Sequence, residues 1–168
     1  MRCIYLIRHA KSSWNDIGLS DFDRPLNERG KKDAPEMAKR LKNRKVKIDA
    51  FITSTAKRAK KTAKYFCEQF NGTEHDLIEI DALYHATDQT FYQVISSVND
   101  KYKNIAVFSH NPGITDFVNG LCKGTTVDNM PTTAIFALSV KAESWKEFPA
   151  AEKKFLFFDY PKKVSDNS

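Results

Sequence analysis

The chain has 168 residues, of which 41% are hydrophobic and 29% charged, a composition typical of soluble globular proteins. This length favours a single domain, which we expect over residues 1–160, followed by a polar tail over 161–168. No run of about 18 apolar residues is present, which excludes a transmembrane helix. The start of the chain lacks the pattern of a secretory signal, and we expect a cytoplasmic protein.

Lysine and arginine exceed aspartate and glutamate by 27 to 21, which gives a formal net charge of +6. Such an excess favours an anionic partner, which could be a phosphate group, a nucleic acid or a membrane surface, or it reflects only solvated lysines. The basic run at 40–47 is either a solvated helix end or a docking surface for an acidic protein. No RNA-binding signature accompanies it, and we expect neither a nucleic acid nor a membrane as partner.

The cysteines and histidines are spaced too irregularly to indicate a metal site. Cys3, Cys67 and Cys122 form no CxxC pair, so we expect free thiols. The four histidines share no HxxH or HExxH spacing, and we expect no metal and no cofactor.

Short apolar runs rich in β-forming residues predict six strands along the chain. These runs cover residues 2–7, 49–53, 77–80, 104–109, 133–140 and 154–159. Apolar residues at helical spacing fall between them and predict helices, which are expected from Asn27 onward, over 55–70, over 88–98 and after Pro112. Alternating strands and helices predict an α/β fold with three layers, α/β/α, around a mostly parallel central sheet.

Two segments interrupt this alternation. Pro35 lies inside the first helical pattern and predicts a kink or a restart there, because proline removes a backbone donor and clashes with the preceding turn. The segment 141–153 separates the last two strands, and we expect it to be a loop.

Cationic or reactive side chains follow closely where three of the predicted strands end. Arg8 and His9 come at the end of the first strand, and His110 follows the fourth. Arg58 comes shortly after the second strand. The carboxyl ends of parallel strands meet at one edge of a sheet, so these side chains are expected to converge there. Guanidinium groups match phosphate oxygens and a neutral imidazole can attack phosphorus, so the pattern predicts a site for a phosphoryl group.

The stretch at 8–15, RHAKSSWN, resembles the Arg-His-Gly signature of the histidine phosphatase superfamily, whose fold is phosphoglycerate-mutase-like. Ala10 in place of the glycine, followed by KSSW, is similar to the SixA-like phosphohistidine phosphatase branch. The resemblance continues in the same order to about residue 160, through 23–30, 54–62, 83–84, 109–113 and 130–132.

This resemblance implies a role for several residues. His9 matches the nucleophile that becomes phosphohistidine, while Arg8, Arg58 and His110 match the residues that hold the phosphoryl oxygens. Asn15 matches a position that helps to bind phosphate in mutase-like relatives.

The sequence departs from the family pattern directly after Leu83-Tyr84. Relatives usually carry a glutamate there, which can act as proton donor, whereas this chain has His85. An imidazole can act as a general acid near neutral pH, so His85 is either the proton donor for the leaving group or only a loop histidine. A protonated imidazole leaves easily, so the missing glutamate favours phosphohistidine over alkyl phosphate esters.

We therefore expect a metal-independent phosphatase that works through a phosphohistidine intermediate. Its short chain leaves little room for a cap over the site, which favours a phosphorylated protein, such as a phosphohistidine carrier or receiver domain, as partner. A small phosphate ester is the other expected substrate, for a broad small-molecule phosphomonoesterase. A third interpretation is a catalytically weak module that only binds phosphorylated ligands, and it follows from the missing glutamate.

Overall fold

A central sheet of six strands organises the computed structural model, which describes residues 1–163. The strands are β1 (Arg2–Arg8), β2 (Ala50–Thr53), β3 (Leu77–Glu79), β4 (Asn104–Ser109), β5 (Ile135–Lys141) and β6 (Glu152–Asp159). Their order across the sheet is β3-β2-β4-β1-β5-β6, and the first four in this order pair in parallel. Strand β5 is antiparallel to both of its neighbours, so the sheet is mostly parallel, as predicted.

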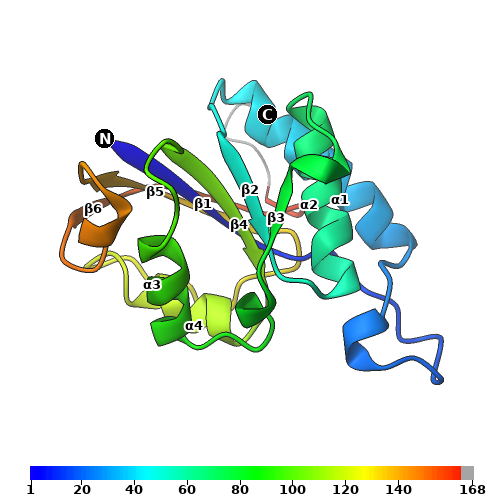
Figure 1. Cartoon of the computed structure of the whole chain (residues 1–168). Helices are drawn as coiled ribbons and strands as arrows, with labels where there is room; N and C mark the ends of the chain where they lie inside the picture. Colours follow the sequence, from blue (N-terminus) through cyan, green and yellow to red (C-terminus); the bar gives the residue numbers. More distant parts are fainter. Residues whose placement is uncertain (164–168) are drawn as a thin grey trace.

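Helices cover both faces of this sheet. They are α1 (Glu28–Asn43), α2 (Lys57–Gln69), α3 (Asp88–Ser96) and α4 (Gly113–Asn119), joined by short 3-10 helices η1 (Asp21–Asp23), η2 (Glu74–Asp76), η3 (Asp81–Leu83) and η4 (Trp145–Glu147). Figure 1 shows α1 and α2 together on one face of the sheet and α3 and α4 on the other. The three-layer α/β/α arrangement is thereby confirmed.

Strand β1 shows why its sequence is a continuous apolar run. Ile4 and Leu6 pack into the core under α3 and α4, whereas Tyr5 and Ile7 pack into the core under α1 and α2. Successive side chains of a strand point to opposite faces, so a strand with helices on both sides must be apolar at every position.

Helix α1 begins where the sequence predicts, because the Asn27 side chain accepts a hydrogen bond from the Gly30 amide at 2.8 Å. The helix then runs through Pro35 without interruption to Asn43, so the expected restart is wrong. Met37 and Leu41 of this helix are buried, and their packing outweighs the donor that Pro35 removes.

The segment 141–153, which was expected to be a loop, contains some regular secondary structure. Strands β5 and β6 extend into it, and η4 forms between them. Ser144 and Glu147 cap η4 reciprocally, a local signal that strand and helix periodicity does not register.

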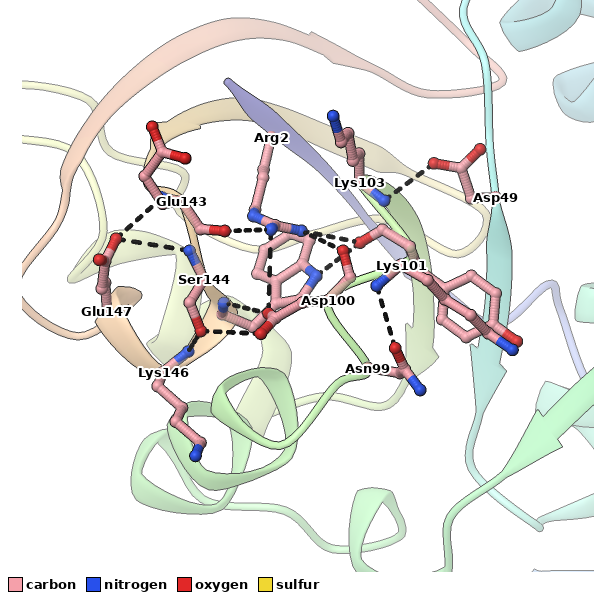
Figure 2. Close-up of polar contacts among 12 residues, drawn as sticks. Arg2, Asp49, Asn99, Asp100, Lys101, Lys103, Glu143, Ser144, Lys146 and Glu147 are labelled. Carbon is pink, nitrogen blue, oxygen red and sulfur yellow. Dashed lines mark hydrogen bonds and ion pairs between the residues drawn. The ribbon is translucent and has the colours of Figure 1, made fainter.

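A buried arginine ties the start of β1 to two distant segments. The Arg2 guanidinium donates from Nη1 to the carbonyl oxygens of Asp100 and Tyr102, at 3.1 Å each, and from Nη2 to the Glu143 carbonyl. Figure 2 shows the guanidinium between these segments. The Trp145 indole donates to the Tyr102 carbonyl at 2.6 Å and completes the cluster. These hydrogen bonds anchor the amino end of β1 to the segments around residues 100–102 and 143.

Within residues 1–163, every helix is too short or too polar to cross a lipid bilayer. Residues 164–168, the larger part of the predicted tail, lie outside the described part of the chain. The boundary between domain and tail stays a prediction.

Candidate active site

The carboxyl ends of β1 and β4 and the first turn of α2 surround a cavity of about 420 Å³. Arg8 and His9 reach it from the end of β1, Arg58 from the first turn of α2, and His110 from the residue after β4. The backbone joins these strand ends directly, since the His9 amide donates to the Ser109 carbonyl at 3.1 Å. The structure therefore brings together the four side chains that the sequence placed on three separate segments.

His9 presents one ring nitrogen to the cavity in a defined chemical state. Its Nδ1 lies 2.7 Å from the Ala10 carbonyl oxygen, and because a carbonyl can only accept, Nδ1 carries the proton. Burial, reinforced by the neighbouring His110 and Arg58, holds the pKa of His9 well below its ordinary value. The ring is therefore neutral, and Nε2 carries a lone pair, toward which the Nε of Arg58 donates at 3.4 Å.

A buried threonine fixes the backbone that holds the His9 ring. The Thr62 hydroxyl accepts from the Ala10 amide at 2.9 Å and donates to the Arg58 carbonyl at 2.7 Å. The loop after β1 and the first turn of α2 are thus joined through one hydroxyl group. On the other side of the loop, the Thr133 amide donates to the carbonyls of Arg8 and His9, at 3.1 Å each.

His110 faces His9 across the cavity, with ring centroids 5.1 Å apart. Its Nε2 makes a hydrogen bond of 2.7 Å with the Ser54 hydroxyl, whereas its Nδ1 is buried and has no hydrogen-bond partner among residues 1–163. Burial, with Arg58 nearby, lowers the pKa of His110 to about 3. The cavity therefore contains two uncharged imidazoles, and the positive charge around them comes from arginine and lysine.

Arg24 and Lys11 also line the cavity, although sequence reasoning gave neither a role. The Arg24 guanidinium lies over the Trp14 ring at 3.5 Å and donates to the Ser12 hydroxyl at 2.8 Å. Arg8 is held in place by the Met130 carbonyl, which accepts from its Nη1 at 2.8 Å. Arg24 lies within the stretch 23–30 that resembles the family, and this was the signal that could have identified it.

The acidic side chain in the cavity wall, Asp21, was missed as well. Its Oδ2 accepts from Arg58 Nη2 at 2.9 Å and from the Tyr84 hydroxyl at 2.5 Å, and its Oδ1 accepts from Arg24 Nε at 3.2 Å. Partial burial acts to raise the pKa of this carboxyl, but the hydrogen bonds from Tyr84 and Arg58 hold it well below its usual range. Asp21 is therefore an ionised carboxylate that binds Nη2 of Arg58, while its backbone carbonyl accepts from Nη1.

Of the two remaining predicted residues, His85 lines the cavity and Asn15 does not. His85 lines the cavity, is exposed, and lies with its ring 4.0 Å from that of Tyr84. Its φ of 60° is in the left-handed region, which is uncommon for a residue other than glycine. Asn15 is exposed and is not among the residues that line the cavity, so its phosphate-binding role stays a prediction.

A comparison with protein-family models identifies the family of this chain. The model that describes the histidine phosphatase superfamily (branch 1) matches residues 4–115. The chain belongs to the histidine phosphatase superfamily. The matched range contains His9, Arg58 and His110, so the resemblance drawn from the sequence is confirmed for the family.

Individual relatives agree with this assignment. An uncharacterised chloroplastic protein of Arabidopsis thaliana is 29% identical over 87% of this chain and 70% of its own length. A 2,3-bisphosphoglycerate-dependent phosphoglycerate mutase of Bartonella tribocorum is 37% identical over 49% of this chain, which spans only 41% of that mutase. The solved structure of SixA from Agrobacterium tumefaciens is 25% identical, with a TM-score of 0.80 over 95% of this chain and 98% of that one. This histidine phosphatase therefore has the phosphoglycerate-mutase-like fold of SixA.

Among residues 1–163, no group of three or more histidine, cysteine, aspartate or glutamate side chains is arranged to hold a metal ion. The side chains that line the cavity carry imidazole, guanidinium, ammonium, carboxylate, amide and hydroxyl groups.

Proposed function

We propose that this histidine phosphatase hydrolyses phosphohistidine on a protein and that the phosphoryl group passes through His9. One observation carries the proposal. A neutral histidine donates from Nδ1 to the Ala10 carbonyl, and its Nε2 lone pair points toward Arg58 Nε at 3.4 Å. Arg8, Arg24 and Arg58 line the cavity that contains it. Such a ring is a nucleophile, and the cations around it suit the dianionic group that it would attack.

In the first step, the lone pair of His9 Nε2 attacks phosphorus. A bond forms between Nε2 and phosphorus while the bond from phosphorus to the substrate nitrogen breaks, and its electron pair goes to the leaving imidazole. Arg58 is close enough to stabilise the transferred group, because its Nε lies 3.4 Å from His9 Nε2. His110 Nδ1, which is buried without a partner among residues 1–163, can donate a hydrogen bond to a phosphoryl oxygen when it carries the ring proton.

The leaving group determines how much acid catalysis the enzyme needs. His85 lines the cavity and is exposed, so as the proton donor it would deliver a proton to the departing atom and recover it from solvent. A substrate imidazole that is already protonated needs no such help, whereas an alkoxide does. Loss of His85 should therefore impair phosphate esters more than phosphohistidine.

In the second step, water attacks the phosphorus of phospho-His9. The bond from phosphorus to Nε2 breaks, the nitrogen recovers its lone pair, and inorganic phosphate leaves. The hydrogen bond from Nδ1 to Ala10 holds the ring in the same tautomer through both steps.

The cavity also supports the alternative of a broad small-molecule phosphomonoesterase, because the phosphoryl-binding groups do not depend on what the phosphate is attached to. The module that binds without catalysis receives less support. Pure binding requires no neutral histidine with a fixed tautomer, and a cationic imidazole would hold an anion better.

One matched assay tests the proposal. Wild type, His9→Ala and His85→Ala are each given a histidine-phosphorylated protein and an aryl phosphate. We expect His9→Ala to lose activity on both by a factor on the order of 10³ or more, and wild type to accumulate an acid-labile phosphoryl group that this variant lacks. Full activity of His9→Ala would refute the mechanism. Turnover of the aryl phosphate alone would replace the protein substrate with small esters.

A further inference from the structure

A second and larger cavity, of about 770 Å³, lies beside the active site. Its walls come from α2, from η1 and the residues after it, and from the first turns of α1, with η2 and β3 at one end. Five lysines line it: Lys31, Lys57, Lys60, Lys61 and Lys64. We refer to this cavity, with these five residues, as the lysine groove.

Four of the five lysines form one face of a helix. Residues 57, 60, 61 and 64 follow the spacing i, i+3, i+4 and i+7, which places them on the same side of α2. Along the helix axis this face is about 10 Å long, at about 1.5 Å per residue. Lysines on a helix face are ordinarily solvated without any partner. Here they line a concave surface that also contains the apolar side chains of Phe22, Leu26 and Leu77.

The carboxylates of the groove pair with only some of these lysines. Lys60 binds Glu79 at 3.0 Å, and Lys64 binds Glu74 at 3.3 Å. Lys57 and Lys61 are exposed and have no carboxylate within 4.0 Å in the part of the chain that the structure describes. With five lysines against the three carboxylates of Asp23, Glu74 and Glu79, the groove keeps an excess of positive charge.

The lysine groove is continuous with the active site. Lys57 and Arg58 are consecutive residues, yet Lys57 lines the groove and Arg58 lines the catalytic cavity. The partition between the two cavities includes Phe22, whose ring lies edge-on to that of Tyr84 at 5.2 Å between centroids. A protein that occupies the groove would therefore lie beside the cavity that contains His9, into which it could place a phosphorylated side chain.

We propose that the lysine groove docks an acidic face of the phosphorylated protein substrate, an inference that rests on the proposed function. Lysine is a mobile point charge that pairs readily with carboxylates. Lys57 and Lys61 lie about 6 Å apart along the helix axis, a spacing that suits two carboxylates on one helix or loop of the partner. The apolar residues of the groove accommodate the hydrocarbon parts of such a surface. Pairing of this kind raises the association rate and selects the partner, while the chemistry stays with His9 and the arginines.

The test compares two charge reversals of equal size. Lys57→Glu with Lys61→Glu alters the groove, and Lys39→Glu with Lys47→Glu alters exposed lysines in and beside the basic run at 40–47. Both double variants change the net charge of the protein by the same amount, so any difference between them comes from where the charges lie. Each enzyme, and the single variant Lys61→Glu, is assayed on a histidine-phosphorylated protein with an acidic surface and on an aryl phosphate.

We expect the kcat/KM of the groove variant on the phosphoprotein to fall about 10-fold at low salt. The loss should be smaller at high salt, because salt screens the pairing of exposed charges. Its activity on the aryl phosphate should stay within about 2-fold of wild type, since the groove is not needed to bind a small ester, and Lys61→Glu should show the same selectivity. Equal effects of the groove and control variants on the phosphoprotein would overturn the docking role, as would a parallel loss on the aryl phosphate.

Two further outcomes separate this inference from its premise. Wild type that hydrolyses the aryl phosphate but no phosphoprotein would contradict the proposed substrate and the docking role with it. A polynucleotide could also inhibit phosphoprotein hydrolysis by wild type. If the groove variant keeps the activity of wild type but is not inhibited by the polynucleotide, the groove binds nucleic acid instead.

Discussion

Two side chains that touch neither ring nitrogen of His9 determine how the histidine is presented. The Thr62 hydroxyl holds the Ala10 amide, and the Ala10 carbonyl holds the His9 ring. The Asp21 carboxylate binds Nη2 of Arg58 and its backbone carbonyl binds Nη1, which leaves Nε of Arg58 toward His9. Both contacts join segments far apart in the chain, and each can be tested by a single substitution.

Replacing Thr62 by valine removes the acceptor for the Ala10 amide and the donor to the Arg58 carbonyl while it preserves the shape of the side chain. We expect kcat to fall about 10-fold with little change in KM, because the His9 ring loses its support. A buried amide without an acceptor should also lower the free energy of unfolding by about 1–3 kcal/mol. Steady-state kinetics and urea unfolding measure the two effects. Thr62→Ser should restore both, and a Thr62→Val enzyme with the kcat of wild type would disprove the role.

Replacing Asp21 by asparagine keeps an acceptor for Arg58 but removes a negative charge from the wall of an anion-binding cavity. We expect inorganic phosphate, the product of a phosphatase reaction, to inhibit Asp21→Asn at a concentration about 5-fold lower than that for wild type at pH 7. The low pKa of Asp21 keeps it ionised, so acidification of wild type to pH 5 should not reproduce the effect. Weaker phosphate binding in the variant would show instead that the charge of Asp21 is needed to position Arg58.

At the scale of elements, the first turn of α1 packs directly onto the loop that follows His9. The Asn27 amide donates to the Lys11 carbonyl at 3.0 Å, and a Cβ on Gly30 would lie 2.2 Å from the same oxygen. Only glycine allows this approach. The helix therefore fixes the path of the chain just after His9.

Gly30→Ala should consequently force α1 and the Lys11 segment apart. We expect the free energy of unfolding to fall by about 1–3 kcal/mol, the range for overpacked sites, with a lower Tm. Gly120→Ala is the matched control, because the nearest atom to its added Cβ is 3.6 Å away. Thermal unfolding of both variants measures the difference. Equal melting temperatures would mean that the loop shifts without cost.

Local patterns predicted most of the elements but not all of their relations. The Asn27 cap and the apolar run of β1 depend on neighbours in sequence, and both were identified correctly. The reversed direction of β5 was not, because apolar runs of parallel and antiparallel strands look alike when both faces are covered. The restart at Pro35 was wrongly expected for a related reason: the local cost of proline is visible in the sequence, whereas the packing that offsets it is not.

At the scale of the whole molecule, burying two histidines beside arginines links stability to pH. The unfolded chain takes up protons on histidine near pH 6.5, whereas burial holds the pKa of His9 well below its ordinary value and that of His110 at about 3. Between these values the unfolded state binds more protons than the folded state. Stability therefore rises with pH in this range.

We expect the free energy of unfolding to fall as the pH is lowered from about 7 to about 5. Each of the two histidines should contribute up to about 1.4 kcal/mol per pH unit below its unfolded pKa. Urea unfolding at several pH values measures the slope, and His110→Asn, which cannot titrate, should flatten it. Identical slopes for wild type and variant would show that the pKa of His110 is the same in the folded and unfolded states.

The sequence by itself determined the chemistry that is local to each segment. It identified the alternation of strands and helices, the three strand ends that carry His9, Arg58 and His110, and the family that shares them. Periodicity, capping and side-chain reactivity are properties of a few neighbouring residues, so they can be recognised before the chain folds.

Only the tertiary structure decided which further groups meet these residues. Asp21 binds Arg58 across 37 positions of sequence, and Thr62 holds Ala10 across 52. The lysine groove likewise requires α2 to lie beside Phe22 and β3. Such contacts follow from how the helices pack on the sheet, a long-range result of burying two apolar faces at once, and no local pattern carries that information.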